Sequence, residues 1–376
     1  MKVVVAIDSF KGSLSSLQAG NAVKDAVLRL NNSAEVIVKP LADGGEGTVD
    51  ALSEGTNTEV VEITVKGPLL KPVTAKYCIL KTTNTAVIEM AAASGITLVS
   101  DAEKNPLNTT TYGVGELIKD AVGRDCRKFI IGIGGSATND GGVGMLTSLG
   151  YEFLDKNGNP IALGAKGLRD LHRIKTEKSL SVLKECSFNI ACDVKNPLCG
   201  ENGCSAVFGP QKGATPQMVR DMDLWLENYA KIAQSVSQSA NKNFPGAGAA
   251  GGLGFAFLTF LNSTLKSGID IVLEEIRLEE VIKSADLVVT GEGRLDSQTV
   301  MGKAPIGVAG LAKKYGKKVI AFSGCVTNDA EVCNDHGIDA FFPILRCVTT
   351  LEDALNPQNA YKNLTATAYQ VLRLLM

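Results

Sequence analysis

The sequence predicts an α/β protein in which a doubly wound parallel-sheet domain, built from both chain ends, carries an inserted mixed α+β domain. Three observations support this fold class. At 376 residues the chain is long for one hydrophobic core, so two domains are expected. Both ends alternate apolar strands with amphipathic helices, as parallel sheets covered on both faces do. The middle of the chain instead contains strand pairs joined by short turns.

The N-terminal segment predicts a βαβ unit. Residues 2–7, KVVVAI, are continuously apolar, as expected of a strand buried on both faces of a parallel sheet. A helix is predicted over 15–31, because serines open it and apolar residues recur there at helical spacing. A second strand follows at 35–40, so the two strands should be parallel, with the helix covering one face.

The C-terminal third repeats this pattern. Residues 285–293, ADLVVTGEG, predict a strand that runs into a loop, and 304–316 predict a helix that ends at Gly316. Another strand is predicted over 317–324. These strands can join the N-terminal ones in a single sheet of the Rossmann or flavodoxin type.

The middle of the chain has a different character. Residues 64–82 predict two strands joined by a Gly-Pro turn, and 151–163 predict a hairpin around Asn-Gly. The Gly/Ala-rich segment 245–254 is expected near the point where the chain returns to the first domain. We therefore assign the doubly wound domain to residues 1–65 and 265–376, and the inserted domain to residues 66–264.

Composition excludes several classes of partner. The net charge of −2 offers no basic face for a phosphate backbone, so nucleic acid is not expected to bind. The most apolar stretch, 253–261, is far shorter than the roughly 20 residues of a membrane span. The first ten residues contain too short an apolar run for a secretion signal. We expect a cytoplasmic protein that acts on small molecules, as a monomer or a homodimer.

The nine cysteines are expected to be reduced, because they are scattered through apolar segments. Cys192, Cys199 and Cys204 could be drawn as metal ligands. Their spacing fits no standard zinc pattern, and the chain has only two histidines to complete a set. We interpret them as small buried side chains.

Polar loops follow five of the predicted strands. Ligands in open α/β sheets bind beyond the carboxyl ends of the strands, which makes these loops the candidate site. Any one of them could be a helix cap or a turn, but five in succession favour a functional role. In chain order they contain Asp8, Ser9 and Lys11; Asp43; Gly134, Gly135, Ser136, Thr138, Asn139 and Asp140; Asp193 and Asn196; and Glu292, Arg294 and Asp296.

The residue types in these loops indicate phosphoryl transfer. Carboxylates and amides with almost no imidazole suit Mg²⁺, and glycine-rich loops present backbone N–H groups to phosphate. Four cations lie in or beside such loops and could neutralise a phosphoryl group during its transfer: Lys11, Lys212, Arg294 and Lys303. The pattern GxxxxGK[ST] does not occur, so this is not a P-loop enzyme.

Other functions fit the sequence less well. Gly132–Ala137 matches GxGxxA after a strand, and Glu152 lies 20 residues beyond Gly132, as in a dinucleotide fingerprint. However, glycines interrupt the helix that should follow, and Glu152 lies in a predicted hairpin. A hydrolase is less favoured, because Ser136 is not in GxSxG and both histidines look structural. A protein that binds a ligand without catalysing a reaction is an alternative that the sequence leaves open.

Together these loops resemble the bacterial glycerate kinase family, the type that lacks a P-loop. The similarity runs from residue 4 to about residue 324, with the motifs in the expected order. Cys204 is a mild departure, because a small residue such as Ala is expected there. The motifs that carry the resemblance are AIDSFKGSLSS, PLADGGEGT, GIGGSATNDGG, CDVKNPLCG, FGPQKGAT, PGAGAAGGLG and VVTGEGRLDSQT with GKAP after it.

The resemblance implies transfer of the γ-phosphate of ATP, with Mg²⁺, to D-glycerate. It also implies a two-domain α/β architecture with the active site in the cleft between the domains. The usual product in this family is 2-phosphoglycerate. Some similar proteins are named 3-kinases, and no residue of this sequence fixes which hydroxyl is phosphorylated.

Individual roles are hypotheses from residue chemistry. Residues 134–142 are expected to form a backbone cradle for either the nucleotide phosphates or the glycerate carboxylate. Asp193, with Asn196 beside it, is the first candidate for the base or for a Mg²⁺ ligand. Asp43, Glu292 and Asp296 are the other candidates for these two tasks, with Asp43 and Asp296 also expected as metal ligands. Lys11 and Arg294 are assigned to phosphate or carboxylate charge, and Asp8 and Ser9 to substrate binding.

Overall fold

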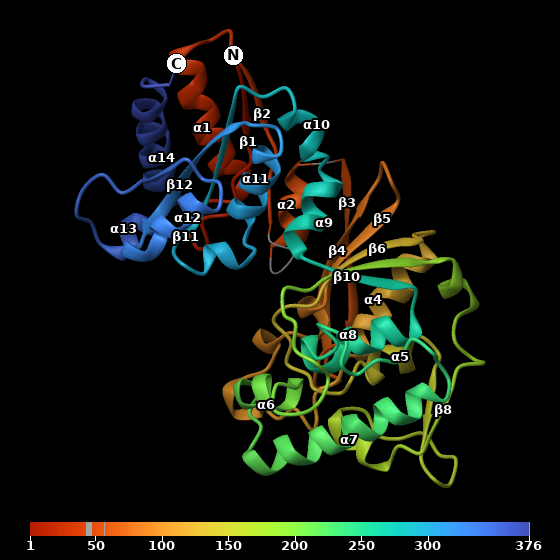
Figure 1. Ribbon diagram of the computed structural model, residues 1–376. Coiled ribbons are helices and arrows are strands. Elements are labelled where there is room, and N and C mark those ends of the chain that lie inside the picture. The colour runs from red at the N-terminus through yellow and green to blue at the C-terminus, as the bar shows by residue number, and fades with distance from the viewer. Residues whose placement is uncertain (43–46, 56, 376) are drawn as a thin grey trace. The chain divides into compact units, whose positions relative to one another are not determined.

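The protein is described here by a computed structural model that covers residues 1–42, 47–55 and 57–375 (Figure 1). The chain forms two compact units: unit 1 contains residues 1–56 and 269–376, and unit 2 contains residues 57–268. The boundary expected at residue 65 falls inside strand β3 (Thr58–Lys66). Because β3 pairs along its whole length with β4 (Pro72–Leu80), it belongs to unit 2.

Unit 1 contains one five-stranded sheet in the order β13-β12-β11-β1-β2. Every neighbouring pair in it is parallel, so the predicted parallel sheet built from both chain ends is confirmed. Strand β1 lies between β2 and β11, which brings the N-terminal strand beside a strand from the last third of the chain. The strands are β1 (Lys2–Val5), β2 (Glu35–Val38), β11 (Leu287–Leu295), β12 (Lys318–Val326) and β13 (Ala340–Pro343).

Helices cover both faces of this sheet. Helices α1 (Ser16–Leu30) and α14 (Pro357–Leu372) lie side by side against one face, where their apolar residues share a core with the strands (Figure 1). Helix α11 (Ala304–Lys313) packs on β11 and β12 and ends three residues before Gly316. The other helices are α2 (Thr48–Gly55), α9 (Gly268–Glu275), α10 (Leu278–Ile282), α12 (Val332–Asp335) and α13 (Leu351–Leu355).

Unit 2 is built on a mixed six-stranded sheet in the order β10-β9-β6-β5-β4-β3. The strands from β3 to β5 pair antiparallel, including the two predicted around the Gly-Pro turn. The strands from β5 to β10 pair parallel. The remaining strands of this sheet are β5 (Thr85–Glu89), β6 (Lys128–Gly132), β9 (Ser187–Ala191) and β10 (Ser263–Lys266).

The hairpin predicted over 151–163 forms only over a short span. Strand β7 (Glu152–Leu154) pairs antiparallel with β8 (Arg173–Lys175), in a separate two-stranded sheet. The Asn-Gly segment forms the predicted turn, and its two sides are joined by the Leu154–Pro160 bridge and by hydrogen bonds from the amides of Asp155 and Ile161. The turn was predicted correctly from local chemistry, whereas the partner strand comes from about 20 residues further along.

The helices of unit 2 pack with its sheet around a large apolar core. All nine cysteines are free thiols, and five of them are buried. Within the ranges that the structure describes, no helix is long and apolar enough to cross a membrane. The helices of unit 2 are α3 (Ala91–Ser94), α4 (Tyr112–Gly123), α5 (Val143–Ser148), α6 (Cys204–Phe208), α7 (Pro216–Gln234) and α8 (Ala249–Phe260).

Candidate active site

The five polar loops fall into two sets, one in each unit. The loops after β1, β2 and β11 belong to unit 1, where these three strands are parallel neighbours. The loops after β6 and β9 belong to unit 2, and these strands are also parallel neighbours. Because parallel strands end at the same edge, each set gathers at one edge of its own sheet. Asp43 lies outside the described residues.

In unit 1 the loop after β1 lies against the end of β11. The Asp8 amide donates a hydrogen bond to the Gly291 carbonyl oxygen at 2.9 Å. A Cβ added to Gly293 would stand 3.4 Å from the amide nitrogen of Lys11. Asp8 is buried, and its Oδ1 accepts the amide of Ser9 at 2.6 Å, whereas Lys11 is exposed. The loop therefore presents Lys11 beside the strand that carries Glu292.

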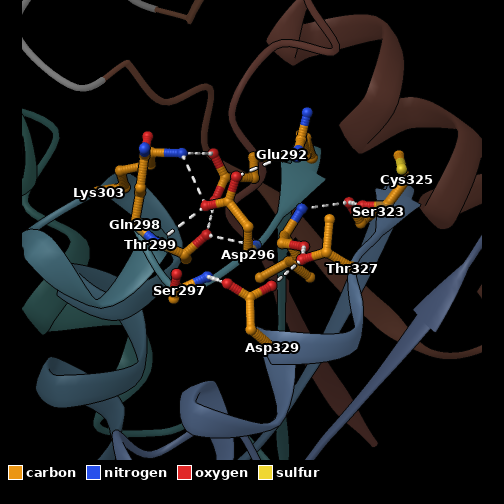
Figure 2. A network of polar contacts seen from close by, with 12 residues as sticks. Glu292, Asp296, Ser297, Gln298, Thr299, Lys303, Ser323, Cys325, Thr327 and Asp329 are labelled. Carbon is orange, nitrogen blue, oxygen red and sulfur yellow. Dashed lines mark hydrogen bonds and ion pairs between the residues drawn. The ribbon is translucent and has the colours of Figure 1, made fainter.

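A network of charged side chains occupies the end of β11, which extends two residues further than predicted (Figure 2). Thr299 Oγ1 donates to Glu292 Oε1 at 2.7 Å. The Lys303 ammonium lies 3.6 Å from Glu292 Oε2 and 3.7 Å from Asp296 Oδ1. Arg294 Nε lies 3.2 Å from Asp296 Oδ2, although the Arg294 side chain is 65% exposed. One lysine is thus shared between two carboxylates.

The surroundings of these carboxylates differ. Burial raises the pKa of Glu292, and the Thr299 hydrogen bond and the Lys303 charge partly oppose that shift. Lys303 is the N-cap residue immediately before helix α11, so the positive end of that helix lies beside the two acidic groups. The edge of this sheet therefore combines carboxylate oxygens with positive charge.

The donor set of unit 1 fits a magnesium ion that arrives with a nucleotide. Mg²⁺ prefers oxygen ligands and is commonly held by one or two carboxylates, with substrate phosphates and water completing its shell. Glu292 and Asp296 offer such oxygens. Across residues 1–42, 47–55 and 57–375, no group of three or more His, Cys, Asp or Glu side chains could hold a metal ion by itself.

In unit 2 the loop after β6 leaves a row of backbone amides open. The amide of Ala137 donates to the Ser94 carbonyl oxygen, and that of Gly141 donates to the Gly251 carbonyl oxygen, both at 2.9 Å. The three amides of residues 134–136 have no acceptor within the described part of the chain. Gly134 and Gly135 are exposed. Successive open amides of this kind form an anion-binding concavity.

Lys212 supports this loop from inside the unit. Its ammonium donates to Ser136 Oγ at 2.7 Å and to the Thr138 carbonyl oxygen at 2.6 Å. Only 2% of the residue is exposed, and burial lowers the pKa of Lys212 to about 8. The next residue, Gly213, has a φ of +90°, and a Cβ there would stand 2.3 Å from the Lys104 carbonyl oxygen, so the backbone after Lys212 packs tightly against that segment. Lys212 was identified from the sequence as a candidate cation, but no local sequence pattern predicted that its side chain would be buried.

Two other predicted loop residues are fully buried. Asn139 Nδ2 donates to Ser205 Oγ at 2.8 Å. Asp140 accepts the amide of Thr111 at 2.8 Å and the amides of Gly142 and Gly144 at 3.1 and 3.2 Å. Burial raises the pKa of Asp140, and these hydrogen bonds oppose the shift. Asn139 and Asp140 therefore fix the loop in place, and Gly134 and Gly135 are its exposed part.

The loop after β9 carries the predicted base. Asp193 is exposed, and its Oδ1 accepts the amide of Gly268 at 3.1 Å. Asn196 organises the loop through two hydrogen bonds, both at 2.9 Å. Its side-chain Nδ2 donates to the Asn202 carbonyl oxygen, and its backbone carbonyl oxygen accepts the Gly248 amide. Gly132 and Ala191 are register partners at the ends of β6 and β9, so the two loops start side by side.

The Gly/Ala-rich segment packs directly against both loops. A Cβ on Gly251 would stand 2.1 Å from the Thr138 carbonyl oxygen, and one on Gly248 would stand 2.2 Å from the Pro197 carbonyl oxygen. The segment was expected near the return to the first domain, but the units meet in sequence at residues 268 and 269, beyond α8 and β10. Its glycines instead allow backbone-to-backbone packing behind the candidate site.

The dinucleotide alternative does not fit this geometry. After β6 the chain runs through ten residues before α5 begins at Val143, so no helix follows the glycines directly. Glu152 lies in β7 of the separate two-stranded sheet, and its carboxylate pairs with Lys178 at 2.8 Å. It is therefore not an acid at the end of a neighbouring parallel strand, where a ribose would bind.

Comparison with known proteins gives concordant matches along the chain. A sequence model described as the Glycerate kinase family matches residues 3–376. A Haemophilus influenzae protein named glycerate kinase is 47% identical, over 100% of this chain and 99% of that protein. An Escherichia coli protein named glycerate 2-kinase is 46% identical, over 97% and 95%. A crystal structure from Salmonella typhimurium, provisionally named glycerate kinase 2, matches with a TM-score of 0.93 at 46% identity, over 100% and 98%.

Proposed function

Because the chain belongs to the glycerate kinase family, we propose that it transfers the γ-phosphate of ATP to D-glycerate, with Mg²⁺, and forms 2-phosphoglycerate. The chain is an enzyme of the kinase class. The Escherichia coli relative carries the name glycerate 2-kinase, which favours the 2-hydroxyl over the 3-hydroxyl as the acceptor. The observation that carries the proposal is the presence of two complementary polar sets, one in each unit.

The set in unit 1 suits a nucleotide. Glu292 and Asp296 provide carboxylate oxygens for a Mg²⁺ ion that accompanies the phosphates, while Lys303, Arg294 and Lys11 provide positive charge. When bound, the ion neutralises charge on the phosphate oxygens. Lys303 is already held between two carboxylates, so it is positioned before a substrate arrives. Its contribution is then electrostatic and needs little reorganisation.

The set in unit 2 suits a small hydroxy acid. The open amides of residues 134–136 can hold a carboxylate, because consecutive N–H groups bind anionic oxygens. Asp193, from the adjacent strand end, is the proposed base that accepts the proton of the substrate hydroxyl. Its exposure leaves the carboxylate accessible to a substrate.

A coupled assay of ADP release tests the proposed activity. ATP and Mg²⁺ are supplied with D-glycerate, with L-glycerate, or with no acceptor, and ADP is followed through pyruvate kinase and lactate dehydrogenase. We expect release that depends on D-glycerate. Release at the same rate without an acceptor would identify an ATPase, and no release together with NAD(H) binding would favour the dinucleotide alternative.

A further inference from the structure

Lys212 is a buried cation that makes no ion pair with any residue in the described ranges. Two of its three N–H donors are used, one on Ser136 Oγ at 2.7 Å and one on the Thr138 carbonyl oxygen at 2.6 Å. Burying an ammonium group is costly, so a site that retains one usually uses its charge. Both of its partners belong to the loop with the open amides.

Ser136 is left with a proton to donate. A hydroxyl has one O–H donor, and here Lys212 occupies the acceptor side of the oxygen. Within residues 1–42, 47–55 and 57–375, the Ser136 hydroxyl has no acceptor. Because the Lys212 ammonium has no lone pair, the O–H of Ser136 must point away from it. The amides of Gly134 and Gly135, two exposed residues just before Ser136, are also unused donors.

We propose that Lys212 is a positioning residue for the acceptor acid: by donating to Ser136 Oγ, it directs the Ser136 hydroxyl toward a carboxylate oxygen held by the amides of Gly134 and Gly135. This inference rests on the proposed function. A carboxylate is favoured over a phosphate because Asp193, the proposed base for the acceptor hydroxyl, follows the strand next to β6. The cations and carboxylates that suit a nucleotide belong to unit 1.

The charges around Lys212 are consistent with this role. Burial lowers the pKa of Lys212 to about 8, and the negative charge of Asp140 only partly opposes that shift. Burial also raises the pKa of Cys204 to about 12, so that thiol stays neutral near pH 7. Below about pH 8 the ammonium is charged and donates to Ser136. At higher pH the neutral amine can accept the serine proton, and the hydroxyl is no longer directed at the substrate.

The test compares three variants with a matched control. Lys212→Met, Ser136→Ala and the double variant are assayed for KM and kcat with D-glycerate and ATP varied separately, and Lys184→Met replaces an exposed lysine of the same unit. We expect both single variants to raise the KM for D-glycerate about 10- to 100-fold, the range for losing a hydrogen bond to a charged group. The KM for ATP should stay within about twofold, and the control should match the wild type.

The double variant separates positioning from a structural role. If Lys212 acts through Ser136, the double variant should have a KM for D-glycerate no higher than that of Lys212→Met alone. The reason is that the effects of substitutions within one hydrogen-bond network are not additive. Additive increases in the KM for D-glycerate, or an increase confined to the KM for ATP, would overturn the proposal. Should Lys212→Met fail to fold, an unchanged KM for D-glycerate in Ser136→Ala would overturn it as well.

The pH profile gives a second readout. In the wild type, kcat/KM for D-glycerate should fall as pH rises through about 8, where Lys212 loses its proton. Ser136→Ala should lack this fall, and a fall of equal size in that variant would contradict the inference. Inactivity of the wild type itself would defeat the proposed function, whereas an active wild type with unaffected variants would defeat only the role of Lys212.

Discussion

Three carboxylates near the strand ends have different surroundings, and these surroundings suit them to different roles. Asp140 is fully buried and accepts hydrogen bonds from three backbone amides, so it serves as an anchor. Glu292 is buried beside Lys303 and Thr299. Asp193 is exposed at the end of β9. A base must exchange its proton with a bound substrate, and of these three only Asp193 is exposed enough to reach one.

The base assignment predicts the effect of Asp193→Asn. Asparagine keeps the size of the side chain and can still accept the Gly268 amide, so the thermal midpoint should stay close to that of the wild type. Without a base, kcat should fall by about 10²- to 10⁴-fold. Steady-state kinetics and a thermal melt on the same preparation check both parts. A near-normal kcat would show that another group takes the proton.

Glu292 predicts a dependence of stability on pH. Its pKa is raised above 4.5 in the folded protein by burial, so the folded state binds the proton more tightly than the unfolded chain. The free energy of unfolding should therefore decrease as pH rises from about 4.5 through the folded-state pKa, by about 1.4 kcal/mol for each pH unit that separates the folded and unfolded pKa values. Urea melts between about pH 4 and pH 8 should show a smaller decrease in Glu292→Gln. Equal slopes in the two proteins would contradict this account.

At the scale of elements, the loops of the candidate site in unit 2 are held by backbone packing. Strands β6 and β9 end together, and their loops are braced from behind by the glycines at the start of α8. That start is strongly bent, because Ala250, Gly251 and Gly252 all have positive φ. Such a path brings main chain against main chain without side chains between them. The loops after β6 and β9 are therefore fixed relative to each other.

This packing predicts that Gly251→Ala is harmful. Its φ of +66° disfavours a side chain, and a Cβ would collide with the Thr138 carbonyl oxygen at 2.1 Å. We expect a loss of about 1–3 kcal/mol in the free energy of unfolding, with a raised KM for D-glycerate because Thr138 shifts. Gly310→Ala in α11 is the control, because a Cβ there meets nothing within 4 Å. Equal stability of the two variants would show that the close packing of Gly251 against Thr138 is not required for stability.

Sequence patterns were sufficient for the strands and helices predicted at the two chain ends, but not for the tertiary contacts between elements. The capping box of Ser15 and Gln18 at the start of α1 is a local feature, as are the apolar runs of β1 and β12. Two partners of Asp140, Thr110 and Thr111, lie about 30 residues earlier in the chain. The burial of Lys212 likewise depends on a loop more than 70 residues away. Such contacts follow from the folded topology and leave no periodic signal.

At the scale of the whole molecule, the order of elements along the chain separates the two polar sets. The sheet of unit 1 combines strands from both ends of the chain, and the whole of unit 2 lies between β2 and β11 in sequence. Each sheet presents its loops at the carboxyl ends of its parallel strands. One set is rich in carboxylates and cations, and the other in open amides. A kinase with one charged nucleotide and one small acid as substrates needs both kinds of surface.

The most direct test of the central claim is the phosphorus spectrum of the product made from ATP, Mg²⁺ and D-glycerate. In a proton-coupled ³¹P NMR spectrum, a phosphate on the 2-hydroxyl couples to one methine proton, and a phosphate on the 3-hydroxyl couples to two methylene protons. We predict a new doublet that grows with ADP. A triplet would contradict the assignment to the 2-hydroxyl, and the absence of any new phosphomonoester signal would contradict the proposed kinase activity itself.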